Sequence, residues 1–175
     1  MKVSEAHTLI KDALPQKRKS TWADLGCGNG IFTNALAGLI GTGSKIYAID
    51  REKHLVDSVV DSVEIEFIQT NFETDQLPIN NLDGILMANS LHYVNNKSAF
   101  IKKIRNVLKV EGQLILVEYD TEKPNAWIPY PINFSKLTEL LKDHGFTQIQ
   151  KIGERQSIYR SEKMYACLVE GLRIQ

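Results

Sequence analysis

The stretch Trp22-Ala23-Asp24-Leu25-Gly26-Cys27-Gly28-Asn29-Gly30 joins an apolar strand pattern to a helical pattern that starts at residue 31. Glycines at alternate positions let the backbone adopt positive φ and leave its N–H and C=O groups open to a ligand. In a strand–loop–helix unit such a loop lies at the carboxyl end of a strand, where open α/β sheets bind their ligands. The stretch therefore predicts a binding loop; the alternative is a glycine turn that only packs a helix on a strand.

The glycine spacing excludes two common nucleotide-binding loops. A Walker loop ends in Gly-Lys-Ser/Thr, whereas Gly30 is followed by Ile31 and Phe32. The dinucleotide fingerprint G-x-G-x-x-G places its third glycine three residues after the second, whereas Gly28 is followed by a glycine two residues on. The pattern is D-x-G-x-G-x-G. From Asp24 onward it resembles the first motif of class I S-adenosylmethionine-dependent methyltransferases.

Length, charge and cysteine content bound the remaining possibilities. We expect one domain over residues 1–175, with a short covering helix in 1–19 and a catalytic core in 20–175. The 21 basic and 21 acidic residues give zero net charge, so no nucleic-acid partner is expected. Two cysteines without metal-ligand spacing indicate a reducing compartment and no metal site. The sequence shows no signal peptide and no apolar run of about 20 residues, which predicts a cytoplasmic protein without a membrane partner. A monomer or a homodimer is expected.

A short apolar run, a turn and a helical pattern recur along the chain, which predicts a mostly parallel sheet covered by helices. The proline-rich segment 120–132 is expected to be a loop. Two strand-like segments close the chain, and the short link between them, which contains Gly153, requires them to be antiparallel. The expected strands are 21–25, 45–49, 65–68, 82–88, 113–118, 146–152 and 157–169, and the expected helices are 3–14, 31–40, 52–60, 98–109 and 135–143.

Polar residues that follow the second and third strands suit an adenosine ligand. Asp50 comes about 20 residues after the last glycine, where a carboxylate can accept hydrogen bonds from both ribose hydroxyls. Its alternative role is to cap a helix that begins near Glu52. In the family that the glycine loop resembles, the third strand leads to an acidic and an apolar residue that contact adenine. Here Asn71 replaces the acidic residue and Phe72 follows it, with a core phenylalanine as the alternative for Phe72.

The fourth strand leads to Leu91-His92-Tyr93-Val94, which resembles the loop of small-molecule methyltransferases related to the ubiquinone and menaquinone biosynthetic enzymes. Leu108-Lys109-Val110-Glu111-Gly112 resembles their following Leu-Lys-Pro-Gly-Gly turn, with two substitutions. The Asn/Asp-Pro-Pro-Tyr motif of base-amine methyltransferases and the Pro-Cys of cytosine-C5 enzymes do not occur at this place. An imidazole at His92 can take a proton from a hydroxyl or amine, although a packing or helix-capping role is the alternative.

The resemblance implies a three-layer Rossmann-like sandwich, with a mostly parallel seven-stranded sheet and an antiparallel C-terminal hairpin. It assigns the glycine loop to the methionine end of S-adenosylmethionine, with S-adenosylhomocysteine as product. The implied cofactor-binding residues are Asp24, Gly26, Cys27, Gly28, Gly30, Asp50, Arg51, Asn71, Phe72 and Asn89. The expected pocket for a small-molecule acceptor consists of His92, Tyr93, Glu118, Tyr119, Trp127 and Tyr130, with His92 as the catalytic residue.

The reaction expected from this resemblance is a direct in-line methyl transfer. A sulfonium is already an activated leaving group, and positioning two reactants in line can lower a barrier by roughly 7–11 kcal/mol without a nucleophilic side chain. Two alternatives stay open at this point. One is a catalytically silent domain of the same fold that binds the cofactor, and the other is a nicotinamide-dependent oxidoreductase on a similar sheet.

Overall fold

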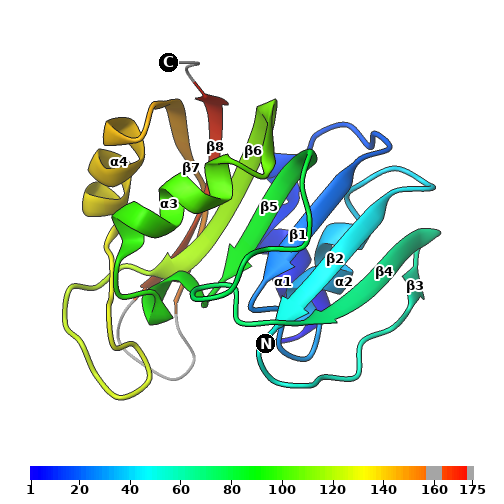
Figure 1. Ribbon diagram of the computed structural model, residues 1–175, viewed down its shortest axis with the longest axis horizontal. Helices are drawn as coiled ribbons and strands as arrows, with labels where there is room; N and C mark the ends of the chain where they lie inside the picture. Colours follow the sequence, from blue (N-terminus) through cyan, green and yellow to red (C-terminus); the bar gives the residue numbers. More distant parts are fainter. Residues whose placement is uncertain (157–162, 173–175) are drawn as a thin grey trace.

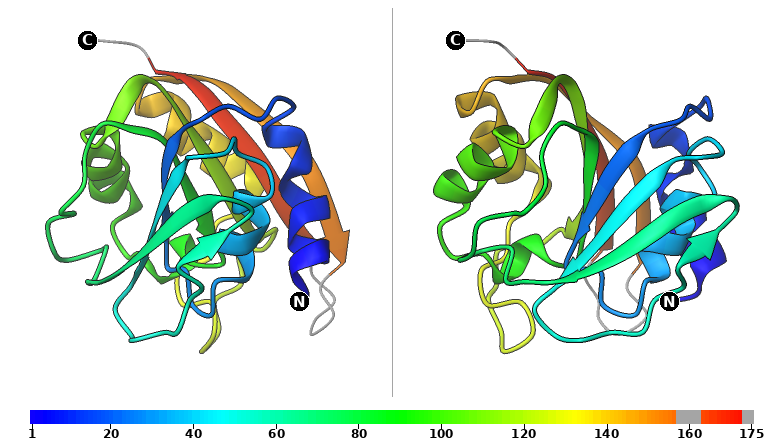
Figure 2. Two further views of the ribbon diagram at one scale, coloured as in Figure 1. Left: turned by 90° about the vertical axis from the view of Figure 1, so that its right-hand side faces the viewer. Right: turned by 45° about the vertical axis from the view of Figure 1, so that its right-hand side comes forward.

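Helices cover both faces of one mixed sheet in the computed structural model, which describes residues 1–156 and 163–172. The strands are β1 (Thr21–Leu25), β2 (Lys45–Asp50), β3 (Val59–Val60), β4 (Val63–Gln69), β5 (Leu82–Ala88), β6 (Leu108–Tyr119), β7 (Phe146–Gln156) and β8 (Lys163–Leu172). The helices are α1 (Val3–Ile10), α2 (Ile31–Ala37), α3 (Lys97–Arg105) and α4 (Phe134–Asp143), with 3₁₀ turns η1 (Lys11–Ala13) and η2 (Leu91–Tyr93). Figures 1 and 2 show α1 and α2 on one face and α3 and α4 on the other.

The strand order confirms the predicted Rossmann-like sandwich. Within the described residues, eight strands are arranged as β3-β4-β2-β1-β5-β6-β8-β7. Strands β4, β2, β1, β5 and β6 are parallel to one another, whereas β3 pairs antiparallel with β4, and β8 pairs antiparallel with both β6 and β7. The sheet has one strand more than expected because β3 was not foreseen.

The predicted helix over residues 52–60 is wrong. This segment follows an irregular path on which Leu55 is 94% exposed, and it ends in β3. The two valines of β3 pair antiparallel with the start of β4. The turn between them consists of Asp61 and Ser62 at φ 49° and 63°. Two left-handed residues match the twist of a β-hairpin, and β-branched valines favour strand over helix.

Other boundaries also differ from expectation. Gly153 lies inside β7 rather than in a link. A Cβ there would be 2.6 Å from the carbonyl oxygen of Leu9, so glycine is needed where α1 packs on this strand. Helix α3 ends at Arg105, and β6 begins at Leu108, five residues before the expected strand. Of the predicted last strand, residues 157–162 lie outside the described part of the chain.

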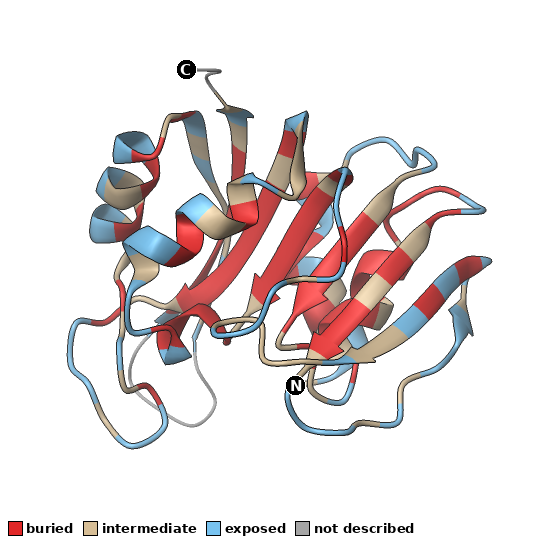
Figure 3. Cartoon of the chain, viewed as in Figure 1, coloured by how far each residue is buried: buried red, intermediate tan, exposed pale blue. Residues whose placement is uncertain are grey.

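The central strands are buried on both faces, whereas β4 is covered on one face only (Figure 3). Glu64 and Glu66 point away from the α1–α2 core, the buried cluster between the sheet and helices α1 and α2. Both form ion pairs with Lys45 of β2, at 2.9 and 2.7 Å.

The carboxyl ends of the parallel strands lie together at the lower edge in Figure 1. The glycine loop, η2 and the 120–132 loop therefore share one edge of the sheet. No helix in the described residues is long and apolar enough to cross a membrane.

Candidate functional site

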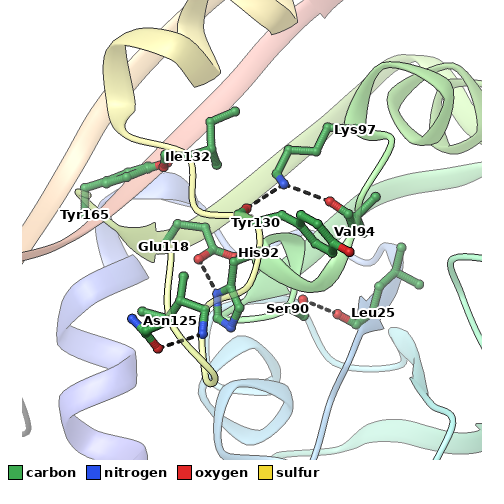
Figure 4. A network of polar contacts seen from close by, with 11 residues as sticks. Leu25, Ser90, His92, Val94, Lys97, Glu118, Asn125, Tyr130, Ile132 and Tyr165 are labelled. Atoms are coloured by element: carbon green, nitrogen blue, oxygen red, sulfur yellow. Dashed lines mark hydrogen bonds and ion pairs between the residues drawn. The ribbon is translucent and has the colours of Figure 1, made fainter. Parts of the chain in front are cut away.

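The glycine loop is fixed tightly where it leaves β1. The backbone N–H groups of Gly26 and Cys27 both donate to the carbonyl of Ile49, at 2.7 and 3.1 Å. Ser90 Oγ donates to the carbonyl of Leu25 at 2.6 Å, which ties the end of β5 to the loop (Figure 4). Gly26 has φ 83°, and a Cβ there would lie 2.5 Å from Ser90 Cβ. Only glycine permits this close approach.

The tip of the loop, in contrast, is open. Gly28 has φ 50°, and a Cβ built on it would have no heavy atom within 4 Å. Its N–H donates to Asp50 Oδ2 at 2.9 Å, so the tip is oriented from β2. Gly30 adopts φ 77° immediately before α2. The main chain at Gly28 is therefore both oriented and free for a ligand to approach.

Asp24 is a buried acid with one unused oxygen. Its Oδ2 accepts a hydrogen bond from Thr33 Oγ1 at 2.6 Å, whereas its buried Oδ1 has no partner. Burial raises the pKa of Asp24 from 3.8 to about 7; the Thr33 hydrogen bond opposes this shift, and the charge of Asp50 adds to it. A buried acceptor without a donor is uncommon and costly, which fits a site that a donor group of a ligand completes.

The raised pKa of Asp24 predicts a pH-dependent stability. The folded state holds the proton more tightly than the unfolded state, so this stabilisation is complete below pH 3.8 and is lost as the pH rises through about 7. A shift of this size corresponds to at most about 4 kcal/mol. We expect urea unfolding of the ligand-free protein to show this loss, and Asp24→Asn to remove it. Parallel pH profiles for both proteins would contradict the assignment.

Asp50 is already engaged by the backbone on both sides. Its Oδ2 accepts from Gly28, and its Oδ1 accepts from the N–H of Glu52 at 3.0 Å. The second contact is a local turn rather than a helix cap, because no helix follows. Each carboxylate oxygen has a further lone pair, so both can still accept ribose hydroxyls. Arg51 is exposed, and its guanidinium lies 3.6 Å from the Glu52 carboxylate.

The loop after β4 differs in detail from expectation. The Oδ1 of Asn71, expected to accept from adenine, accepts the N–H of Glu73 at 3.0 Å, so it also stabilises the turn. Phe72 is half-buried, and its ring comes within 3.3 Å of the position that a Gly26 Cβ would occupy. Lys103 of α3 donates to the carbonyls of Phe72 and Glu73 at 2.8 and 3.2 Å. It anchors this loop to α3.

A buried histidine–carboxylate pair lies on the acceptor side. His92 Nδ1 is 2.7 Å from Glu118 Oε2, and the backbone N–H of His92 donates to Glu118 Oε1 at 3.1 Å (Figure 4). The two residues are 2% and 1% exposed. The rings of Tyr93 and Tyr119 lie 4.5 and 6.1 Å from the imidazole, measured between centroids. The structure therefore brings together four of the six residues expected in the acceptor pocket.

The other two pocket residues, Trp127 and Tyr130, lie on the 120–132 loop. Trp127 is 71% exposed, and Tyr130 is exposed too. Lys97 donates to the carbonyls of Val94 and Tyr130 at 2.8 and 2.6 Å, which fastens the loop to η2 and α3. Sequence reasoning missed Lys97, because the carbonyl of Tyr130 that it binds belongs to a different loop. Its pKa is lowered, mainly by burial.

Two further predicted cofactor residues occupy the same edge of the sheet. Asn89 follows β5 with φ 56°, and its buried Oδ1 has no partner. Cys27 lies in the loop, and burial raises the pKa of its thiol, with smaller effects from Asp24 and Asp50. A neutral buried thiol is unreactive, so Cys27 fits a packing role. The unused acceptor oxygens of Asn89 and Asp24 suit a ligand rich in donors.

Comparison with known proteins places these features in a wider group. The family model described as "Methyltransferase domain" matches residues 23–116, just over half of the chain. A ubiquinone/menaquinone biosynthesis C-methyltransferase of Pasteurella multocida is 26% identical over 160 residues, which cover 86% of this chain and 54% of the relative. The chain thus spans about half the length of the curated relatives it matches.

Solved structures show the same fold at low sequence identity. The YcgJ protein of Bacillus subtilis matches with a TM-score of 0.74 and 13% identity, over 98% of this chain and 100% of that one. A 1,6-didemethyltoxoflavin-N1-methyltransferase of Burkholderia thailandensis matches with a TM-score of 0.71 and 15% identity, over 98% of this chain and 78% of that one. The latter structure contains 1,6-didemethyltoxoflavin and S-adenosylhomocysteine.

Proposed function

Because the chain belongs to the methyltransferase domain family, we propose that it binds S-adenosylmethionine and transfers the methyl group to a small-molecule acceptor. The proposed cofactor site is the glycine loop with Asp24, Asp50, Asn71, Phe72 and Asn89. Zero net charge supports a small molecule rather than a nucleic acid as acceptor. The monomeric or homodimeric state and the cytoplasmic location stay predictions.

The open, oriented glycine loop beside Asp24 is the observation that carries this proposal. Gly28 leaves room for a ligand directly against the main chain, and the neighbouring acid keeps one buried oxygen free of protein donors. S-adenosylmethionine has an ammonium group at its methionine end and donors on its ribose and adenine. The donor-rich ligand therefore matches the unused acceptors of the site.

Within this site the chain's own residues bind and orient. S-adenosylmethionine, when bound, supplies a methyl group on a positively charged sulfur that leaves readily. We assign the ribose to Asp50, the adenine face to Phe72 and the methionine end to the Gly26–Gly30 loop. His92 faces the acceptor side and can take the proton that the acceptor loses.

Calorimetric titration of the purified protein with S-adenosylmethionine, S-adenosylhomocysteine and NADH tests the proposal directly. We expect both sulfur compounds to bind with micromolar affinity and NADH to bind at least about 100-fold more weakly. Tighter binding of NADH would favour an oxidoreductase. Cofactor binding without methyl transfer to any member of a broad metabolite panel would favour a silent domain of the same fold.

Asp50→Ala is expected to weaken S-adenosylmethionine binding at least about tenfold, because a hydrogen bond to a charged group contributes roughly 1.5–3 kcal/mol. The substitution also removes the acceptor that orients the N–H of Gly28. Asp83→Ala is the matched control. Asp83 likewise accepts a backbone N–H, from Thr21, and pairs with Lys109, but at the opposite edge of the sheet. Equal affinities for the two variants would refute the ribose assignment.

A further inference from the structure

The contacts of Glu118 determine which ring nitrogen of His92 carries a proton. A carboxylate accepts hydrogen bonds and cannot donate them, so Nδ1 at 2.7 Å from Glu118 Oε2 must bear the hydrogen. A neutral imidazole then has its lone pair on Nε2. In residues 1–156 and 163–172 we find no hydrogen-bond partner for Nε2, and Figure 4 shows Nδ1 as the nitrogen turned towards Glu118.

Glu118 also constrains the main chain of His92. Glu118 Oε1 accepts the N–H of His92, so the carboxylate holds both the main chain and the ring of one residue. The pair joins the end of β6 to η2, the turn that follows β5. It is buried, which makes its geometry expensive to change. The orientation of the imidazole is therefore set before any acceptor arrives.

We propose that Glu118 is a positioning residue that holds His92 in the tautomer whose Nε2 accepts a proton from the methyl acceptor. The inference rests on the proposed function and defines the acceptor class. The acceptor carries a removable proton, either on the methylated atom, as in a hydroxyl or an amine, or on the enol oxygen when the adjacent carbon is methylated. A thioether or a tertiary amine would need no such group.

The step balances without a further reactant. The acceptor atom gives an electron pair to the methyl carbon while the carbon–sulfur bond breaks and leaves its pair on sulfur. The proton of the acceptor moves to Nε2, and the imidazolium that forms is balanced by the carboxylate of Glu118 at Nδ1. The rings of Tyr93 and Tyr119 lie beside the imidazole, with centroids 4.5 and 6.1 Å from it.

If Glu118 only stabilised the fold, it would make the same two hydrogen bonds with His92. The test must therefore report the tautomer of the imidazole. In Glu118→Gln the amide oxygen can still accept the backbone N–H, but the amide NH₂ donates to Nδ1 and moves the ring proton to Nε2. Glu122→Gln is the matched control, because Glu122 pairs with Asn133 and Lys136 on the surface of the same region.

Nitrogen NMR of the imidazole rings in the full chain, at about pH 8 where free histidine is neutral, measures this directly. His92→Gln identifies the signal among four histidines. We expect an unprotonated Nε2 in the wild type and in Glu122→Gln, and a protonated Nε2 in Glu118→Gln. An unprotonated Nδ1 or a doubly protonated ring in the wild type would overturn the proposal, as would an unchanged tautomer in Glu118→Gln.

Reactivity supplies a second measurement that does not depend on a known acceptor. Diethyl pyrocarbonate acylates unprotonated, accessible ring nitrogens, and mass spectrometry locates the product. His92 is only 2% exposed, so we expect it to react slowly in the wild type and at least about tenfold more slowly again in Glu118→Gln, where Nε2 carries the proton. If His54 reacts while His92 does not, no acceptor can reach Nε2 and the proposal fails. S-adenosylmethionine titration of the same samples reports separately on the proposed function.

Discussion

Gly28→Val is expected to weaken S-adenosylmethionine binding at least about 100-fold, corresponding to roughly 3 kcal/mol of lost binding free energy. A Cβ at this position meets no protein atom within 4 Å, so the protein itself has room for the side chain. The space that valine fills is the space we assign to the methionine end of the cofactor. Calorimetric titration measures the loss.

The control must separate loss of space from backbone strain. Gly28 has φ 50°, and a β-branched residue there costs on the order of 1–3 kcal/mol in folding stability. Gly43→Val carries a similar cost, because Gly43 has φ 75° and only ordinary contacts with the Lys19 side chain. We expect both variants to unfold at lower urea concentration and only Gly28→Val to lose the cofactor. Normal binding by Gly28→Val would place the ligand elsewhere.

The sheet and the position of the site could be predicted from local patterns. The glycine loop, the apolar runs and the short tail hairpin are each encoded within a few residues, and parallel strands bring their carboxyl ends to one edge whatever their side chains. The resemblance at D-x-G-x-G-x-G and at Leu91–Val94 was sufficient to identify the family. The sequence therefore predicted the fold class and the edge of the sheet at which the candidate site lies.

Contacts between distant segments could not be predicted in the same way. Lys97 and Lys103 each donate to a carbonyl of a loop some 30 residues away in sequence, a contact that no local pattern indicates. The free Oδ1 of Asp24 and the pairing of His92 with Glu118 also depend on segments that meet only in the fold. The helix expected over 52–60 failed because the tertiary pairing of β3 with β4 outweighed local helix propensity.

Gly84 shows how a glycine inside a strand pattern reports a packing requirement. It lies in the middle of β5, directly opposite Trp22 of β1 in the parallel register. A Cβ on Gly84 would be 2.3 Å from Cη2 and Cζ3 of the Trp22 indole. The indole is buried in the α1–α2 core, and its six-membered ring lies against the glycine. An alanine at position 84 would therefore force the buried ring or the central strand to shift.

Gly84→Ala is therefore expected to destabilise the protein by about 3 kcal/mol, at the upper end of the usual cost of overpacking a core. Urea unfolding of the variant measures this loss. Gly38→Ala is the control, because a Cβ there comes no closer than 3.5 Å to any atom, and it is expected to change stability by less than about 0.5 kcal/mol.

A double-mutant cycle identifies the cause of the loss. Trp22→Leu alone leaves a cavity and should cost roughly 2–4 kcal/mol, but it also frees the space that an alanine at position 84 needs. The double variant should then be more stable than the sum of the two single losses by at least about 1 kcal/mol. Strict additivity would mean that the indole does not pack on Gly84, and the α1–α2 core would need a different arrangement around β1.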